Sequence, residues 1–349
     1  MSCGSVRLLA GGLALDAVGS AALAREPYFL ERQATIEPPS YPAERWENAA
    51  AFLGQKLFFD TRLSRTGTTA CASCHHPAYA FAEPRRVSIS DTGTRGRRNA
   101  PSLINAGFLS TLMWDGRFRT LEQQALGPFR RGEMGIGVDE AVHRLNSNPE
   151  YVHLFRLSFD RHPTADGMAR ALAAYQRTLV SRESRVERFL RTSEPGLLSR
   201  LEYDGLLVFD TRAACSACHR IAPPRSGPWM NAPVPFTDMR FHNLGIGFTG
   251  GRFTDPGRYG VSGVDSDLGA FRTPSLRNVA RTAPYMHDGS LATLEEVVEF
   301  YDAGGRPNPN LSPRIRPLLL NGYEKAALVA FLRALTDQEF EHMRPVGLW

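Results

Sequence analysis

The sequence contains no run of about 18 to 20 consecutive apolar residues, the length that a helix needs to cross a bilayer, so we expect no membrane span. It also lacks basic clusters interleaved with aromatic residues. The arginines behind the net charge of +5 are scattered, which argues against a nucleic-acid partner. No stretch shows the sustained alternation of a half-buried strand. We therefore expect a mainly α fold, and 349 residues allow two domains.

Cysteine is scarce: there are five, and four of them stand in two copies of the pattern Cys-x-x-Cys-His. The copies are Cys71-Ala-Ser-Cys74-His75 and Cys215-Ser-Ala-Cys218-His219. Two cysteines at this spacing can form thioether bonds to one haem, and the histidine that follows becomes an axial ligand of its iron. A zinc site or a dithiol redox centre would leave both histidines unexplained. The pattern predicts two covalently bound haem c groups.

The N-terminus is similar to an export signal. Arg7 precedes a mostly small and apolar stretch from Leu8 to Leu23, and Ala22-Leu23-Ala24 is similar to an Ala-x-Ala cleavage site. An irregular N-terminal tail is the alternative interpretation. We expect residues 1–24 to be a cleaved signal peptide and the mature protein to be periplasmic. Cys3 would leave with the signal, so no cysteine remains for a disulfide bond.

An internal repeat relates the two halves of the chain. Residues 101–105, 113–116 and 120–122 recur at 274–278, 286–289 and 293–295, all at one offset of 173 residues. Self-similarity at a fixed offset indicates two copies of one structural unit. We expect an N-terminal cytochrome c-like domain over residues 25–192 and a C-terminal one over 193–349, with a linker at Ser193-Glu-Pro-Gly.

The repeat also distinguishes the two haems. In each copy we expect a helix that starts after Thr-Leu-Glu to lie across the haem face opposite the histidine. At the common offset, Pro128 of the first copy corresponds to Tyr301 of the second. Proline has no donor atom for iron, whereas tyrosine has a phenolate, so the first haem should stay open and Tyr301 should ligate the second. Met286 and His287 are the alternative ligands, and Tyr301 could instead be a core aromatic residue.

Apolar spacing predicts a helix from Ala165 to Leu190 that closes the first domain, and a last amphipathic helix from Gly322 to Thr336. The residues from Ile221 to Gly263 are rich in proline and glycine, and we expect them to form a long loop over the second haem. His242, within this loop, is expected to pack near that haem.

With these motifs in place, the chain resembles the bacterial di-haem cytochrome c peroxidase and MauG family over roughly residues 45 to 340. The matching segments are Phe58-Phe59-Asp60-x-Arg62-Leu63, Arg98-Asn99-Ala100-Pro101, Trp114-Asp115-Gly116-Arg117 and residues 276–285. The resemblance implies two cytochrome c-like helical domains with one haem each, joined near a calcium ion. Tyr301, where the peroxidase branch has methionine, and the lack of histidine from Pro77 to Arg98 are similar to the MauG branch.

The resemblance also implies roles by position. His75 would be the proximal ligand of the peroxide-reactive haem, and His219 that of the electron-transfer haem. Trp114 matches the aromatic residue between the haems, although it could be plain core. Three residues match the distal pocket: Gln124, Pro128 and Glu133. Three match the calcium site: Asn99 and, through backbone oxygens, Thr282 and Pro284. Glu133 could instead be a solvated loop acid, and Pro128 simply the end of a helix.

These residues predict a hydrogen-peroxide-dependent oxidoreductase of the MauG type. Peroxide would bind at the open iron above His75, Glu133 would move the proton that lets the O–O bond break, and Gln124 would orient the peroxide. Oxidising equivalents would pass through Trp114 to the second haem and be used on an external protein. The alternatives are a classical cytochrome c peroxidase, with a small cytochrome or cupredoxin as electron donor, and a di-haem electron carrier that is not an enzyme.

Overall fold

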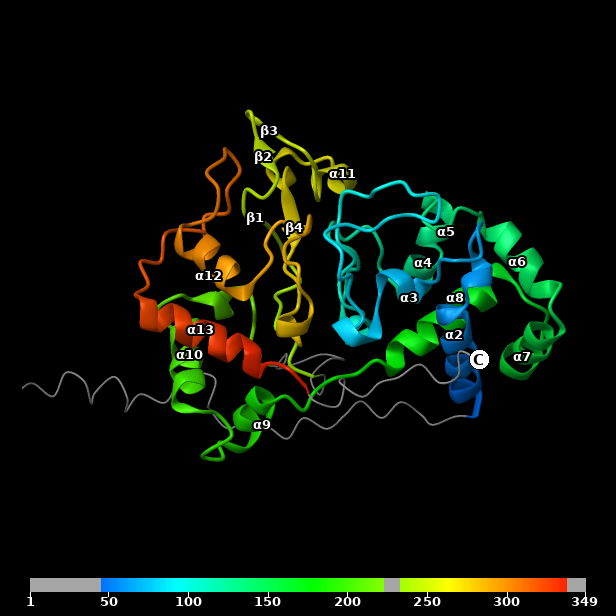
Figure 1. The fold of residues 1–349 in the computed structure, drawn as a ribbon, viewed down its shortest axis with the longest axis horizontal. Helices are drawn as coiled ribbons and strands as arrows, with labels where there is room; N and C mark the ends of the chain where they lie inside the picture. Colours follow the sequence, from blue (N-terminus) through cyan, green and yellow to red (C-terminus); the bar gives the residue numbers. More distant parts are fainter. Residues whose placement is uncertain (1–44, 223–232, 338–349) are drawn as a thin grey trace, which may run out of the picture.

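The computed structural model describes residues 45–222 and 233–337 (Figure 1). The predicted signal peptide, residues 1–24, lies outside this part of the chain. The described residues are mostly helical, so the mainly α fold is confirmed. Two antiparallel two-stranded sheets are added, one pairing β1 (Phe241–Asn243) with β4 (Ala270–Arg272) and one pairing β2 (Phe248–Thr249) with β3 (Arg252–Phe253). None of the helices described is long and apolar enough to cross a membrane.

The helices form two groups. Those of the first half are α2 (Arg45–Phe59), α3 (Cys71–Cys74), α4 (Leu121–Ala125), α5 (Gly127–Arg131), α6 (Val138–Asn146), α7 (Pro149–Phe159) and α8 (Ala165–Thr178). Those of the second half are α9 (Arg185–Thr192), α10 (Arg200–Asp210), α11 (Tyr259–Ser262), α12 (Leu294–Asp302) and α13 (Gly322–Ala334). In Figure 1, α2 to α8 lie on one side, and α10, α12 and α13 lie on the other.

Each group encloses a hydrophobic core of its own. Leu57 of α2 and Leu172 of α8 belong to the first core, and Leu206 of α10 and Phe331 of α13 belong to the second. Residues from α9 already pack in the second core. The domain boundary between residues 192 and 193 stays a prediction.

In each half, a glycine lets two helices cross with their backbones in contact. A Cβ atom at Gly54 of α2 would lie 1.9 Å from the carbonyl oxygen of Ala171 in α8. A Cβ atom at Gly205 of α10 would lie 1.9 Å from the carbonyl oxygen of Ala327 in α13. The two halves therefore share one helix crossing. The sequence repeat did not reveal it, because these pairs stand at offsets other than 173.

The repeat found in the sequence is also a repeat of conformation. Met113 and Met286 both have a left-handed backbone, with φ of 69° and 70°. Thr120 and Thr293 both act as N-caps, of α4 and α12, by accepting a hydrogen bond from the third residue that follows. Equivalent positions of the two copies thus have equivalent geometry.

The helix predicted from Ala165 to Leu190 is wrong as a single element, because α8 ends at Thr178 and α9 begins at Arg185. The residues between them are irregular, since side chains from elsewhere bind their backbone. Asp337 Oδ2 accepts hydrogen bonds from the backbone nitrogens of Arg182 and Glu183, each at 3.0 Å. The side chain of Ser184 then caps α9. A helical pattern of apolar residues cannot reveal such long-range backbone contacts.

Two other predicted segments differ in detail from the structure. The last helix begins at Gly322, as predicted, and ends at Ala334 rather than Thr336. The described part of the segment from 221 to 263 is not one plain loop, because it includes β1, β2, β3 and α11. Residues 223–232 of this segment lie outside the described residues.

Arg98 joins the two halves. Its guanidinium donates to Asp115 of the first half, with Nη1 to Oδ2 at 2.6 Å, and to both carboxylate oxygens of Asp255 in the second half, at 2.7 and 2.8 Å. Burial alone would raise the pKa of each carboxyl group, but the arginine contacts outweigh burial and lower both. Both carboxylates therefore stay charged at the junction.

We predict that Gly54→Ala lowers the free energy of unfolding by about 3 kcal/mol, because the added methyl group would overlap with helix backbone that cannot rotate away. Denaturant unfolding would measure the change. Gly322→Ala is the matched control: nothing lies within 4 Å of its added Cβ, and stability should change by no more than about 0.5 kcal/mol. Equal stability of the two variants would contradict the close helix crossing.

Candidate active site: two cavities

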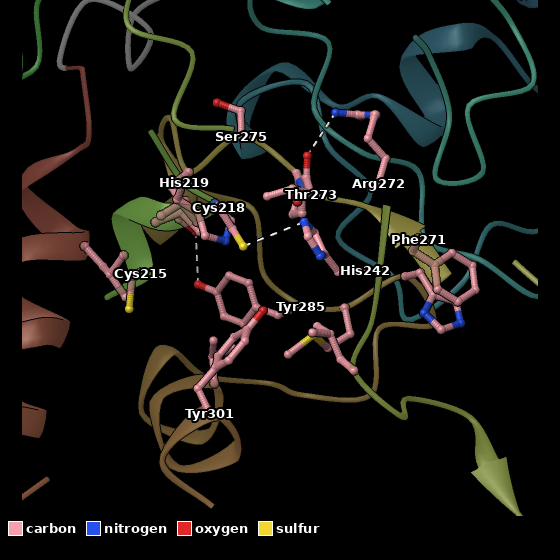
Figure 2. A pocket seen from close by; sticks show the side chains of 18 of the residues that line it. Cys215, Cys218, His219, His242, Phe271, Arg272, Thr273, Ser275, Tyr285 and Tyr301 are labelled. Carbon is pink, nitrogen blue, oxygen red and sulfur yellow. Dashed lines mark hydrogen bonds between the residues drawn. The ribbon is translucent and has the colours of Figure 1, made fainter. Parts of the chain in front are cut away.

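Each Cys-x-x-Cys-His motif faces a cavity of its own. Cys71, Cys74 and His75 line a cavity of about 910 Å³ in the first half. Cys215, Cys218 and His219 line one of about 520 Å³ in the second half, which is drawn in Figure 2. Both volumes are in the range of small-molecule and cofactor sites.

The two motif histidines have the same environment. Nδ1 of His75 lies 3.1 Å from the backbone oxygen of Phe81, and Nδ1 of His219 lies 3.1 Å from that of Phe236. A histidine that binds a metal usually donates its other ring N–H to such an oxygen, which leaves Nε2 as the ligand atom. Burial lowers the pKa of His75, and that of His219 to about 4, so both rings are neutral, as ligation requires. This arrangement fits two axial haem ligands.

The motif cysteines do not fit a dithiol redox centre. All four are free of disulfide bonds. Burial raises the pKa of Cys71 and of Cys215 to about 12, whereas reactive dithiols have lowered pKa values. The two cavities, the paired thiols and the oriented histidines together fit covalently attached haem.

Tyr301 of α12 lines the second cavity (Figure 2). Its hydroxyl has no hydrogen-bond partner among the described residues. Burial, together with the nearby Cys215 and Cys218, raises its pKa, so a phenolate there needs a cation beside it. Tyr285, in the same cavity, differs because its hydroxyl donates to the backbone oxygen of Val279 at 3.0 Å. Of the two hydroxyl groups, that of Tyr301 is the one available to a ligand.

The alternative ligands Met286 and His287 also line the second cavity. The imidazole of His287 stacks on Phe271, with 3.6 Å between ring centroids and 15° between planes, and meets Trp114 edge-on at 6.4 Å. Both ring contacts of His287 are packing contacts with aromatic side chains. Met286 stays an alternative to Tyr301.

The three residues predicted for the distal pocket all line the first cavity, so the structure brings Gln124, Pro128 and Glu133 together. Pro128 is the second residue of α5, which contradicts its interpretation as the end of a helix. The Glu133 side chain is half-exposed, yet its Oε2 is buried and has no hydrogen-bond partner in the described chain. Its Oε1 lies 4.0 Å from Nε of Arg131. Glu133 is therefore placed as an acid at the cavity wall.

Trp114 is buried in the wall between the two cavities and lines both of them. Its Nε1 donates to the backbone oxygen of Asn99 at 2.8 Å. The backbone nitrogen of Arg272 donates to the oxygen of Trp114 at 2.7 Å, and that of Asn99 donates to the oxygen of His287 at 2.8 Å. Backbone hydrogen bonds from both halves thus hold Trp114 in place.

The three residues predicted for calcium face the same cavity. Asn99, Thr282 and Pro284 all line the second cavity. The side-chain nitrogen of Asn99 donates to the backbone oxygens of Glu83 and Arg85, each at 2.9 Å, which leaves its Oδ1 as an acceptor. A bound calcium ion stays a prediction.

Two buried polar residues of the cavities were not predicted from the sequence. Gln176 of α8 lines the first cavity, and its Oε1 has no partner in the described chain. The sequence could have indicated Gln176, because it is a polar residue between Leu172 and Leu179 on the apolar face of a helix. Arg272 lines both cavities, and its signal was its repeat counterpart, Asn99.

Comparisons with known proteins agree with this site. A family model described as di-haem cytochrome c peroxidase matches residues 48–195. The chain is 36% identical over 291 residues to the methylamine utilization protein MauG of Methylorubrum extorquens, covering 81% of this chain and 77% of the relative. It is 33% identical over 326 residues to cytochrome-c peroxidase IdrP1 of a Pseudomonas species, covering 88% and 86%. The crystal structure of a MauG-like protein associated with microbial copper homeostasis superposes with a TM-score of 0.78 at 32% identity, covering 91% of this chain and 98% of that one.

We predict that Tyr301→Phe changes the ferric spectrum of the second haem from low-spin to high-spin, because the predicted phenolate ligand would be lost. Low-temperature electron paramagnetic resonance would measure it. Tyr285→Phe is the matched control, since that hydroxyl is bound to the backbone and should leave the spectrum unchanged. An unchanged spectrum of Tyr301→Phe would instead favour Met286 as the ligand.

His242 lines the second cavity, as expected, and its Nε2 lies 2.9 Å from Oδ2 of Asp238. This contact, together with the neighbouring Cys218 side chain, raises the pKa of His242 from 6.5 to about 9. Because the folded-state pKa is the higher one, the stability gained is fully present below the unfolded pKa and is lost as the pH rises through 9. We predict that His242→Gln lowers the midpoint of thermal denaturation near pH 6. Toward pH 10 the variant and the wild type should have the same midpoint, because the wild-type histidine is then neutral. The exposed His153→Gln should have no effect at either pH.

Proposed function

We propose that this chain, which belongs to the di-haem cytochrome c peroxidase and MauG family, works as a MauG-like oxidase with an open first haem and a tyrosine-capped second haem. Membership makes it a di-haem c-type oxidoreductase that acts with peroxide. Relatives carry both peroxidase and MauG names, so the division of labour between the haems is the proposal. The observation that carries it is the contrast between Pro128 in the first cavity and the unpartnered hydroxyl of Tyr301 in the second.

The haems would supply iron that activates peroxide at the first site and holds an oxidising equivalent at the second. His75 and His219 would each present Nε2 to iron, with the ring fixed by the bond at Nδ1. Oε2 of Glu133, buried without a partner, would take a proton from one peroxide oxygen and give it to the departing one. The amide of Gln124 would orient the peroxide.

Trp114 would carry electrons between the sites, since it lines both cavities. The final electron source is proposed to be a protein, either a small cytochrome or cupredoxin, or a target protein that is oxidised without entering the cavity. We also propose a periplasmic location and a calcium ion at Asn99, Thr282 and Pro284.

Two alternatives make different demands on the first cavity. A classical peroxidase of the reductively activated kind needs a histidine that blocks the resting iron, and among the described residues His75 is the only histidine that lines this cavity. An electron carrier needs a sixth ligand there, for which Met113 or Met134 of the cavity wall would have to serve. Neither methionine is required by the oxidase proposal.

The electron paramagnetic resonance spectrum of the fully ferric protein tests the proposal. One high-spin and one low-spin signal in equal amounts are expected, from one open and one capped iron. Two low-spin signals would contradict it, and would point to an electron carrier or to a peroxidase that needs reductive activation.

We also predict that Glu133→Gln lowers the rate of peroxide turnover by about 100-fold, because the amide cannot accept a proton. Stopped-flow kinetics with peroxide would measure this. Glu140→Gln, which changes an exposed acid of α6, is the control and should leave the rate unchanged. A normal rate in Glu133→Gln would remove the acid from the mechanism.

A further inference from the structure

We propose that Arg272 is a carboxylate-binding residue of the second haem site, and that its guanidinium pairs with a propionate of that haem. The inference rests on the two haem sites of the proposed function, but not on the peroxide chemistry. Arg272 would be a positioning residue, which holds the haem and biases its reduction without touching the reacting atoms.

Arg272 is a buried cation. It belongs to β4, only 4% of its surface is exposed, and it lines both cavities. Burial lowers its pKa to about 10, so the guanidinium is still charged at neutral pH. A charge removed from water is costly unless an opposite charge or a full set of hydrogen bonds compensates it.

The protein itself supplies no such charge. Nε of Arg272 donates to the backbone oxygen of Met113 at 3.3 Å, and Nη1 donates to that of Thr273 at 3.1 Å, as Figure 2 shows for the second bond. Within residues 45–222 and 233–337, no carboxylate forms an ion pair with it, and Nη2 has no acceptor. Two carbonyl oxygens are neutral dipoles, so a full positive charge remains at this position.

The buried Arg277 and the half-buried Arg98 both have carboxylate partners. Arg98 is bound by Asp115 and Asp255, and Arg277 forms two hydrogen bonds of 2.5 Å with the carboxylate of Glu187. The missing partner is therefore a particular feature of Arg272. An anion that does not belong to the chain would give Arg272 the partner that the other two arginines have.

The second cavity indicates what that anion is. Four arginines line it, namely Arg272, Arg277, Arg314 and Arg316, and no aspartate or glutamate does so among the described residues. The first cavity differs in its acids rather than in its cations: six arginines line it, but Asp115, Glu133 and Asp255 are in its wall as well. A cavity with a cationic, acid-free lining selects a ligand that carries negative charge, and the propionates of a haem attached at Cys215 and Cys218 are carboxylates.

Arg272 also connects this ligand to the wall between the cavities. Its Nε is bound to the backbone of Met113, and its backbone nitrogen is bound to Trp114. The repeat places the neutral Asn99 at the equivalent position of the first copy. The two copies therefore differ in charge at this position, which lies in the wall that both cavities share. A positive charge beside a haem favours its reduced form, so Arg272 raises the reduction potential of the second haem.

Spectroelectrochemical titration of both haems tests the inference without any turnover. We expect Arg272→Gln to shift the reduction equilibrium of the second haem at least tenfold toward the ferric form, which corresponds to about 59 mV for a one-electron couple. Arg272→Lys keeps the charge and should retain most of the wild-type potential. Unchanged potentials in Arg272→Gln, or a shift confined to the first haem, would overturn the proposal.

Two controls keep this test decisive. Arg252→Gln removes an exposed arginine of β3 that lines neither cavity, and should leave both potentials unchanged. If Arg272→Gln does not incorporate haem, resonance Raman spectra of the Arg272→Lys variant still report on the contact. The propionate bending mode of the second haem should shift while spin states stay the same, and an unshifted mode would overturn the proposal. These measurements use no peroxide. Unchanged potentials in the Arg272 variants would therefore not contradict the proposed oxidase activity, and a lack of peroxide turnover would not contradict the pairing of Arg272 with a propionate.

Discussion

The relation between the two halves depends on the guanidinium of Arg98, which binds one buried carboxylate of its own half and one of the other half. Removing one partner from a buried ion pair costs about 3 to 5 kcal/mol, so the three side chains hold each other in place. Asp115 directly follows Trp114, and Asn99 directly follows Arg98. The ionic junction therefore also sets the position of the indole and of its hydrogen-bond acceptor, the backbone oxygen of Asn99, between the two cavities.

The molecule consists of two copies of one unit that differ at a small number of informative positions. Shared geometry, such as the helix crossings at Gly54 and Gly205 and the histidine bonds at Nδ1, is what each copy needs to enclose a haem. The differences assign separate tasks. Pro128 in the first copy and Tyr301 in the second would make one site open and the other capped. Asn99 in the first copy and Arg272 in the second put a neutral and a charged residue at equivalent positions of the wall between the cavities. Duplication provided two equivalent sites, and single side chains made them unequal.

Charge differs between the two sites in a way that suits their proposed tasks. The first cavity has acids in its wall, which proton transfer to and from peroxide requires. The second has a cationic lining without acids and a tyrosine whose raised pKa keeps it neutral until a cation is near. A site that exchanges electrons needs no proton donor of its own. The aromatic rings of Trp114 and His287, repeat counterparts in edge-to-face contact, lie where the two sites meet.

The sequence by itself determined the haem motifs, the repeat, the helical class and the pairing of Pro128 with Tyr301, because these depend on spacing along the chain. Only the tertiary structure decided what depends on residues far apart in sequence. It showed that Trp114 lines both cavities, that Asp337 prevents one long helix after Ala165, and that Arg272 is buried without a carboxylate partner. Burial and the pairing of charges are properties of the packed molecule, and no local pattern of residue types encodes them.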